Sequence, residues 1–128
     1  MSYHFTTTVD MDFDAAIEHT TAALKEKGFG VLTTIDVQKA MKEKIDKDIN
    51  PYTILGACNP SYAYKALQSE NKIGTMLPCN VVVQKTDDGK IEVSAVDPAA
   101  SMSAIENPNL GSVAGEVRDM LKDMIANL

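Results

Sequence analysis

The chain contains no tryptophan and only two cysteines, and aromatic side chains make up 5% of its 128 residues. So few aromatic rings argue against a stacking pocket for a sugar or a nucleobase. Two cysteines are also too few for the disulfide framework of a small secreted protein. No segment approaches the roughly 18 consecutive apolar residues of a membrane span, so we expect a water-soluble domain.

The length and the net charge of the chain exclude further classes of protein. A chain of 128 residues has room for one hydrophobic core, so residues 1–128 are expected to form a single domain. The formal net charge of -6 would repel a phosphate backbone, and we expect no nucleic-acid partner. The first residues, Met-Ser-Tyr-His-Phe, lack the basic start and the apolar run of a secretory signal. We therefore expect a cytoplasmic protein without a membrane partner.

Hydrophobic periodicity, caps and turn residues predict the element order β-α-β-α-β-α-β-β-α. The expected strands span residues 2–9, 29–35, 52–58, 77–85 and 91–96. The expected helices span 13–27, 37–45, 60–67 and 108–128, with Asp12, Asp36 and Asn59 as caps of the first three. A loop or a short helical turn should follow Pro98.

The connections between these elements predict the architecture. Strands joined by a helix generally pair in parallel, whereas the turn at Asp88 and Gly89 indicates an antiparallel hairpin. The predicted fold class is therefore α/β (α+β), with a mixed five-stranded sheet and helices packed on it.

Two similar motifs stand out in the middle of the chain, Gly56-Ala-Cys58-Asn-Pro60 and Leu77-Pro-Cys79-Asn-Val81. Each places a Cys-Asn pair at the boundary of an expected strand. Over residues 52–83, the chain resembles the domain-of-unknown-function 302 (DUF302) family, whose members carry this G-x-C-N-P and L-P-C-N-V pairing. The resemblance implies a small α/β domain that is often dimeric, without an established activity, and we therefore expect a homodimer.

The candidate site is centred on Cys58. This residue comes just before an expected helix, whose unpaired N–H groups and dipole favour a thiolate and would also suit an anionic ligand. Gly56 would let a ligand approach the backbone closely. The candidate ligand-binding residues are Gly56, Cys58, Asn59, Pro60 and Asn80, and the candidate catalytic thiols are Cys58 and Cys79.

An alternative interpretation is that both cysteines are small buried hydrophobic residues, and it fits Cys79 better than Cys58. In a parallel pair of strands, the two cysteines would lie at opposite ends of the sheet. Their sulfurs can converge only if the strand that begins near Cys79 is antiparallel to the strand before it, or displaced. The sequence leaves both arrangements open.

Metal chemistry finds little support in the sequence. A zinc site is disfavoured because His4 and His19 are the only histidines and no C-x-x-C motif exists. Monovalent copper is better matched, with Cys58, Cys79 and Met76 or Met102 as sulfur ligands. The aspartates at 10, 12 and 14 are more typical of helix capping than of a hard-metal site. Since core packing explains the methionines at least as well, we predict no metal and no cofactor.

Three functions remain. The first is a small-ligand-binding or regulatory homodimer, with a site near Cys58 for a small anionic or sulfur-containing ligand. The second is thiol-based redox or sulfur transfer through a persulfide, with Cys58 as nucleophile and Cys79 as resolving thiol, or binding of a soft metal such as copper. The third is a structural module that acts through its surface. Whether the protein is an enzyme is left open.

Overall fold

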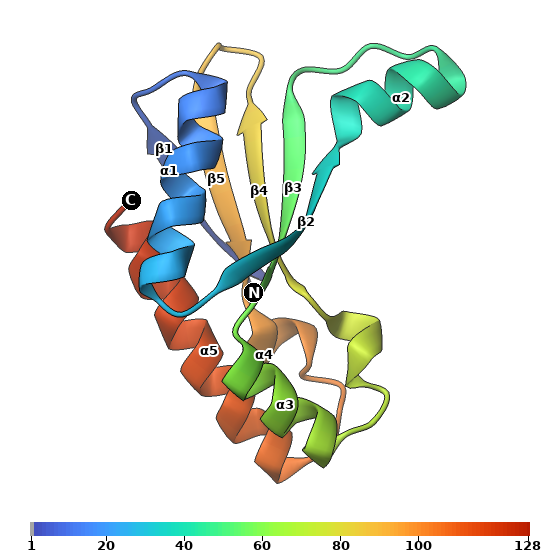
Figure 1. Cartoon of the computed structure of the whole chain (residues 1–128), viewed down its shortest axis with the longest axis vertical. Helices are drawn as coiled ribbons and strands as arrows, with labels where there is room; N and C mark the ends of the chain where they lie inside the picture. The colour runs from blue at the N-terminus through green and yellow to red at the C-terminus, as the bar shows by residue number, and fades with distance from the viewer. Residues whose placement is uncertain (1) are drawn as a thin grey trace.

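The structure, a computed structural model, describes residues 2–128 as one five-stranded sheet with helices around it (Figure 1). The strands are β1 (His4–Val9), β2 (Gly30–Asp36), β3 (Tyr52–Cys58), β4 (Cys79–Lys85) and β5 (Ile91–Val96). The helices are α1 (Phe13–Glu26), α2 (Val37–Ile45), α3 (Pro60–Ser69), α4 (Pro98–Ser101) and α5 (Pro108–Ala126), and the 3-10 turn η1 spans Ile73–Met76. This confirms the predicted order, and α4 is the helical turn after the last strand.

The strand order is β1-β5-β4-β3-β2, and every neighbouring pair is antiparallel. The α+β class and the five strands are confirmed, but the parallel pairs expected within a mixed sheet are not found among residues 2–128. The reason lies in the position of the helices. A parallel pair needs a helix that runs back along the sheet, whereas α2 and α3 lie beyond opposite ends of it (Figure 1). The one helix between strands that does run back, α1, joins β1 and β2, which are the two edge strands.

Helices α1 and α5 cover one face of the sheet (Figure 1). Alternate residues of β3, β4 and β5 point toward these helices, and Leu55, Val83 and Val93 are at most 1% exposed. Their burial removes a large apolar area from water, which stabilises the fold. We call this set the main core: Val9, Ala16, Leu24, Phe29, Leu55, Ala57, Cys79, Val81, Val83, Ile91, Val93, Ala95, Val117, Leu121, Met124 and Ile125.

A second, smaller core lies beyond the end of the sheet where α3, α4 and the beginning of α5 meet (Figure 1). It consists of Ala66, Ile73, Met102, Leu110 and Ala114. Helix α5 links the two cores, because its first turns contribute Leu110 and Ala114 to the second core and its later turns contribute Leu121 to the main core. Pro108 at its first turn and the side chain of Asn107 at its cap define where this helix begins.

No helix described among residues 2–128 packs over the other face of the sheet, and we call it the open face. Strand register places one row of residues across it: Ile35, Ile54, Val82, Ser94 and Thr6. The row changes from apolar side chains on β2, β3 and β4 to hydroxyl side chains on β5 and β1. The open face is therefore half apolar and half polar.

Residues 30–45 form β2 and α2, and we call them the β2–α2 arm. The arm begins at the sheet, where Val31 packs against the main core, and α2 at its other end extends away from both cores (Figure 1). No side chain of α2 is buried. Local interactions hold the helix instead: the Asp36 carboxylate accepts a hydrogen bond from Lys39 N at 2.9 Å, and Lys42 pairs with Asp46 at 2.9 Å. Leu32 and Ile45 are 69% and 60% exposed, so the arm presents apolar side chains to solvent.

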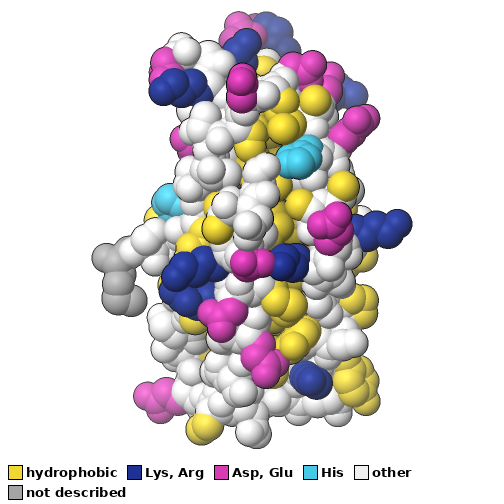
Figure 2. All heavy atoms as spheres, turned by 90° about the vertical axis from the view of Figure 1, so that its left-hand side faces the viewer, with side chains coloured by type: hydrophobic (Ala, Val, Ile, Leu, Met, Phe, Trp, Pro, Cys, Tyr) yellow, Lys and Arg dark blue, Asp and Glu magenta, His cyan; other side chains and the backbone are white. Residues whose placement is uncertain are grey.

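On the side of the molecule shown in Figure 2, acidic and basic side chains are interspersed rather than gathered by sign. None of the helices described among residues 2–128 is both long and apolar enough to cross a membrane.

Candidate functional site: the cysteine pocket

The antiparallel pairing of β3 and β4 brings the two cysteines to the same end of the sheet. Cys79 is paired with Ala57, the residue immediately before Cys58. Both thiols are free, and Cys58 lies close enough for its charge to affect the titration of Cys79. The structure thus has the antiparallel arrangement, which is one of the two that allow the sulfurs to converge.

Both cysteines line a pocket between the main core and the second core. We call it the cysteine pocket. Its walls are Phe29, Ala57, Cys58, Asn59, Tyr62, Ala63, Ala66, Leu77, Pro78, Cys79, Pro98, Met102, Leu110, Val113, Ala114 and Val117. Its interior volume is about 40 Å³, a few times the volume of about 10–15 Å³ that a single water molecule requires. Only a ligand, or a part of a ligand, of a few atoms fits this space.

The two thiols occupy different environments. Cys79 is 7% exposed, and Cys58 is half-buried. Burial, and secondarily the charge of Cys58, raises the pKa of the Cys79 thiol to about 11. Cys79 therefore stays protonated at neutral pH, while Cys58 is the thiol that a reagent in solution can reach. The burial of Cys79 agrees with the expectation that it is the more core-like of the pair.

Asn59 is the residue before α3, as predicted, but its side chain does not cap the helix. Its amide nitrogen donates a hydrogen bond to the carbonyl oxygen of Lys27 at 3.4 Å. The same amide lies against Gly28, whose positive φ of 85° ends the loop after α1. This contact thus links the start of α3 to the loop before β2. The prediction that the Asn59 side chain caps α3 is wrong. Pro60 at the first helical position is confirmed.

The remaining sequence-predicted site residues lie outside the cysteine pocket. Gly56 is a packing glycine: a Cβ there would lie 2.2 Å from Thr33 Oγ1 and 2.8 Å from Pro78 Cγ, so the neighbouring side chains fill the space expected for a ligand. Asn80 is exposed and points to the open face, where it lines a shallow groove with His4 and Ser94. Pro60 does not line the pocket either.

The two methionines proposed as copper ligands differ in position. Met102 follows α4, is 8% exposed and lines the cysteine pocket. Met76 is 38% exposed and does not line it. Sequence reasoning did not find Tyr62 or the wall formed by α5. The apolar stripe of α5 was visible in the sequence, but it could not show which of its turns would border a cavity.

Three of the other candidate metal residues, Asp12, His19 and His4, have structural partners. The Asp12 carboxylate accepts a hydrogen bond from Ala15 N at 2.8 Å, as a capping residue does. His19 Nε2 is 2.9 Å from the carbonyl oxygen of Leu128, and His4 Nδ1 is 2.6 Å from Thr6 Oγ1. Among residues 2–128, no group of three or more His, Cys, Asp or Glu side chains is placed to hold a metal ion.

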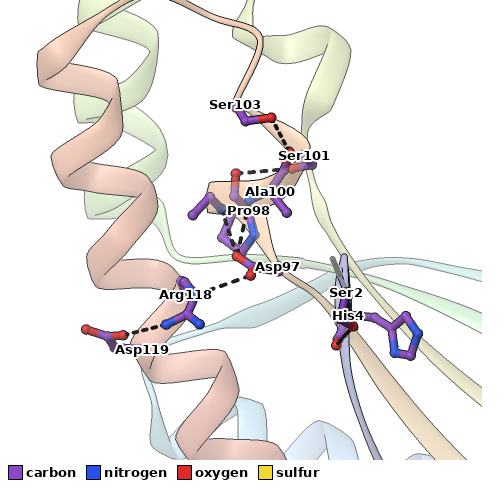
Figure 3. Close-up of polar contacts among 10 residues, drawn as sticks. Ser2, His4, Asp97, Pro98, Ala100, Ser101, Ser103, Arg118 and Asp119 are labelled. Atoms are coloured by element: carbon purple, nitrogen blue, oxygen red, sulfur yellow. Dashed lines mark hydrogen bonds and ion pairs between the residues drawn. The ribbon is translucent and has the colours of Figure 1, made fainter.

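A partly buried ion pair between Asp97 and Arg118, which the sequence did not reveal (Figure 3), fixes the turn that leads to Met102. Asp97 is 8% exposed; its Oδ1 accepts hydrogen bonds from Ala99 N and Ala100 N at 3.0 and 3.3 Å, and its Oδ2 pairs with Arg118 Nε at 3.2 Å. Arg118 also lies 5.3 Å from the ring centre of Phe5. These contacts attach α4 to α5 and β1, and so hold the turn before Met102 in place.

Comparison with known proteins agrees with this architecture. The model of the family described as domain of unknown function DUF302 matches residues 5–128. The chain belongs to the DUF302 family. The crystal structure of an uncharacterized conserved DUF302 protein from Bacillus stearothermophilus is similar over 98% of this chain and 98% of that chain, with a TM-score of 0.91 and 28% sequence identity. No curated protein matches the chain. The resemblance seen in residues 52–83 thus extends over nearly the whole chain.

Proposed function

We propose that this DUF302 protein binds a small thiol-seeking ligand in the cysteine pocket, as a binding or regulatory protein. The observation that carries the proposal is that two thiols from different strands line one pocket, with one thiol accessible and one buried. Such thiols stay reduced in a compartment like the cytoplasm, where we propose that the protein acts.

The walls of the pocket favour a soft ligand over a hydrated anion. Most of the side chains around it are apolar, and they raise the pKa of Cys79, which means that they disfavour negative charge. The first turn of α3 was expected to attract an anion, but Cys58 and the apolar side chains of α3 and α5 border this space. Of the anionic and sulfur-seeking ligands considered from the sequence, we therefore propose the sulfur-seeking class.

A thermal-shift comparison tests this proposal on freshly reduced, metal-free protein. Arsenite, which binds pairs of thiols, should raise the melting temperature, whereas sulfate and phosphate should leave it unchanged, because only a ligand that binds the native state stabilises it. Cys58→Ala should abolish the arsenite effect. An equal shift in the variant, or a shift with the anions alone, would contradict the proposed ligand class.

We also propose that the protein is a homodimer, with the β2–α2 arm and the apolar half of the open face as the interface. The same chain carries an uncovered amphipathic helix and an uncovered apolar sheet surface, with Leu32, Ile35 and Ile45 all 48% or more exposed. In a two-fold pair, each copy presents the same surface to the other, so both can be covered at once. A second copy is therefore the occupant that this surface fits.

Sedimentation velocity tests the dimer. Ile35→Lys should weaken the association at least tenfold, because it would bury a charge in the interface. Tyr64→Lys is the matched control, since Tyr64 is 66% exposed but lies on α3, away from the arm. A wild-type protein that sediments as a monomer at high concentration would overturn the dimer and leave the ligand site unaffected.

Thiol exchange is a second candidate function. It is favoured by the neighbouring positions of an accessible thiol, Cys58, and a buried one, Cys79, which could act as attacking and resolving thiols. In this reaction, the Cys58 thiolate attacks a disulfide or persulfide substrate and expels its thiolate. Cys79 then passes its proton to the expelled thiolate and attacks the Cys58 sulfur of the mixed species. This step forms the Cys58–Cys79 disulfide and releases the substrate's second sulfur as a thiolate or, from a persulfide, as hydrosulfide. Incubation with oxidised glutathione should yield this internal disulfide, and a stable glutathione adduct on Cys58 alone would contradict it.

A further inference from the structure

We propose that a groove on the open face of the sheet binds a small organic cation, a primary amine with a short carbon chain. We call it the open-face groove. The side chains that matter for the argument are Glu92 and Ser94 of β5, Gln84 and Val82 of β4, Tyr52 of β3 and His4 of β1. The open-face groove shares no lining residue with the cysteine pocket, so this inference goes beyond the proposed function.

The charge of the groove sets the class of ligand. Glu92 is the only carboxylate among the lining side chains, and none of them is a lysine or an arginine. Glu92 is half-buried, and in the part of the chain that the structure describes no basic side chain forms an ion pair with it. A partly buried carboxylate without a partner loses part of its hydration, and a bound cation offsets this loss. An anion would find no lysine or arginine to bind.

The side chains next to Glu92 can complete the binding of an ammonium group, which has three N–H donors. Gln84 lies directly opposite Glu92 in the register of β4 and β5, where the β-carbons of such a pair are about 4.5–5.5 Å apart. Ser94 follows two residues along β5, about 7 Å away on the same face. The carboxylate, the amide oxygen of Gln84 and the hydroxyl of Ser94 are three acceptors for these three donors.

A chain of hydrogen bonds holds the β1 side of the groove in place. His4 Nδ1 is 2.6 Å from Thr6 Oγ1, and Thr6 Oγ1 is 2.8 Å from Ser94 Oγ. His4 extends from β1 away from α5 (Figure 3). Whichever hydroxyl donates, Ser94 Oγ keeps at least one lone pair for a ligand. Because these side chains are already ordered, binding costs less conformational entropy.

The other walls fit a short carbon chain. Val82 lies opposite Ser94 and contributes an apolar side chain. Tyr52 lies opposite Gln84 on the side of β3, and the face of a tyrosine ring attracts a cation. The volume of the groove is about 330 Å³, at the lower end of the roughly 300–1,000 Å³ of small-molecule sites. A ligand of a few heavy atoms therefore fits.

The proposed dimer leaves most of the groove uncovered. Of the apolar row Ile35, Ile54 and Val82 on the open face, only Val82 also lines the groove. The side of the groove formed by β5 and β1 lies outside the proposed interface. Amine binding and dimerisation are therefore separate properties.

The test is a titration of the reduced protein with n-butylammonium chloride, followed by backbone amide shifts in NMR at constant ionic strength. We expect saturable shifts around Gln84, Glu92 and Ser94. Glu92→Gln should weaken binding at least about tenfold, because it replaces a charge-assisted hydrogen bond with a neutral one. Ser94→Ala should weaken it by about two- to tenfold, as loss of one neutral acceptor does.

Glu26→Gln is the matched control, because it removes the same charge from an exposed position on α1, which covers the opposite face of the sheet (Figure 1). This variant should bind n-butylammonium as tightly as the wild type. The anion n-butyrate has a carbon chain of the same length and should give no saturable shift.

Three results would overturn the inference: no saturable shift with n-butylammonium, equal binding by the wild type and Glu92→Gln, or saturable binding of n-butyrate in the groove. None of them would affect the cysteine pocket, because the response to arsenite does not depend on Glu92. Conversely, a protein that ignores arsenite but binds n-butylammonium through Glu92 would lose the proposed function and keep the open-face site.

Discussion

The two faces of the sheet differ although they are built from the same strands. On β3, Leu55 points to the covered face and is 1% exposed, while its neighbour Ile54 points to the open face and is half-buried. The covered face is packed against α1 and α5, and it ends at the cysteine pocket. The open face ends at the β2–α2 arm, whose helix buries no side chain. One face thus supports the fold and borders the pocket for which we propose a ligand, and the other carries the surface that we propose as the dimer interface.

The largest expected effect on stability comes from comparing alanine substitutions at these two neighbouring residues. Leu55→Ala should lower the free energy of unfolding by about 2–5 kcal/mol, because it leaves a cavity in the main core. Ile54→Ala should cost less than about 1 kcal/mol in dilute, monomeric protein, because its side chain already contacts solvent. Urea denaturation of the two variants measures both values. Equal costs would show that the open face is covered even in the monomer.

The pH dependence of stability probes the covered face at Cys79. Its pKa rises from the ordinary 9.0 to about 11 in the folded protein, so between these pH values the unfolded chain loses the thiol proton while the folded protein keeps it. The stabilising contribution is therefore complete below pH 9 and is lost as pH rises through 11. The loss approaches about 2–3 kcal/mol.

Cys79→Ala is the control for this measurement, because lysines and tyrosines titrate in the same range. Denaturation curves at pH 8 to 11 should show that wild-type stability falls more steeply than that of the variant. Parallel pH profiles would mean that Cys79 is not buried as the structure describes.

Gly56 is the place where the open face is tightly packed, so substituting it tests the difference between the two faces of the sheet. Gly56→Ala should destabilise the protein by about 1–3 kcal/mol, since its Cβ would collide with Thr33 and Pro78. Gly30→Ala, on the neighbouring strand, has nothing within 4 Å of its Cβ and should be nearly neutral. If chemical denaturation shows no loss of stability in Gly56→Ala, then β2 and the segment before β4 can move to make room for the added methyl group.

The smallest effect on stability is expected from a substitution on the β2–α2 arm. Lys42→Ala removes ion pairs with Asp46 and Asp48, but these carboxylates are each 86% exposed. Surface pairs of this kind contribute less than about 1 kcal/mol, and often nothing measurable. Denaturation in low and high salt should give almost the same stability for the variant and the wild type. A cost well above 1 kcal/mol would mean that the arm is not solvated.

The order of elements was predictable because it depends on local patterns: the alternating apolar residues of β1, the cap Asp36 and Pro108 at the start of α5 all act within a few residues. The direction of the strands was not predictable. It depends on where α2 and α3 lie relative to the sheet, which no local sequence pattern indicates. The exposure of α2 escaped prediction for the same reason, since its stripe of apolar residues is also typical of a buried helix.

The candidate site was predictable in part. The repeated Cys-Asn motif marked both cysteines, but only the antiparallel register places them at the same end of the sheet. Asn59 has the residue type and position of a cap, yet its side chain binds the Lys27 carbonyl across the sheet end, which is a tertiary contact. Tyr62 and the residues of α5 complete the pocket through packing between distant segments, which sequence spacing does not reveal.

The most direct test of the cysteine pocket is the mass of reduced protein after treatment with phenylarsine oxide, followed by iodoacetamide. The reagent bridges two thiols that face one another, with loss of one water molecule. We predict one arsenic adduct per chain that protects both Cys58 and Cys79 from alkylation, and no stable adduct in Cys58→Ala. If the folded protein gives no bridged adduct, or if Cys58 is alkylated at an undiminished rate, the two thiols do not share a pocket and the proposed site is wrong.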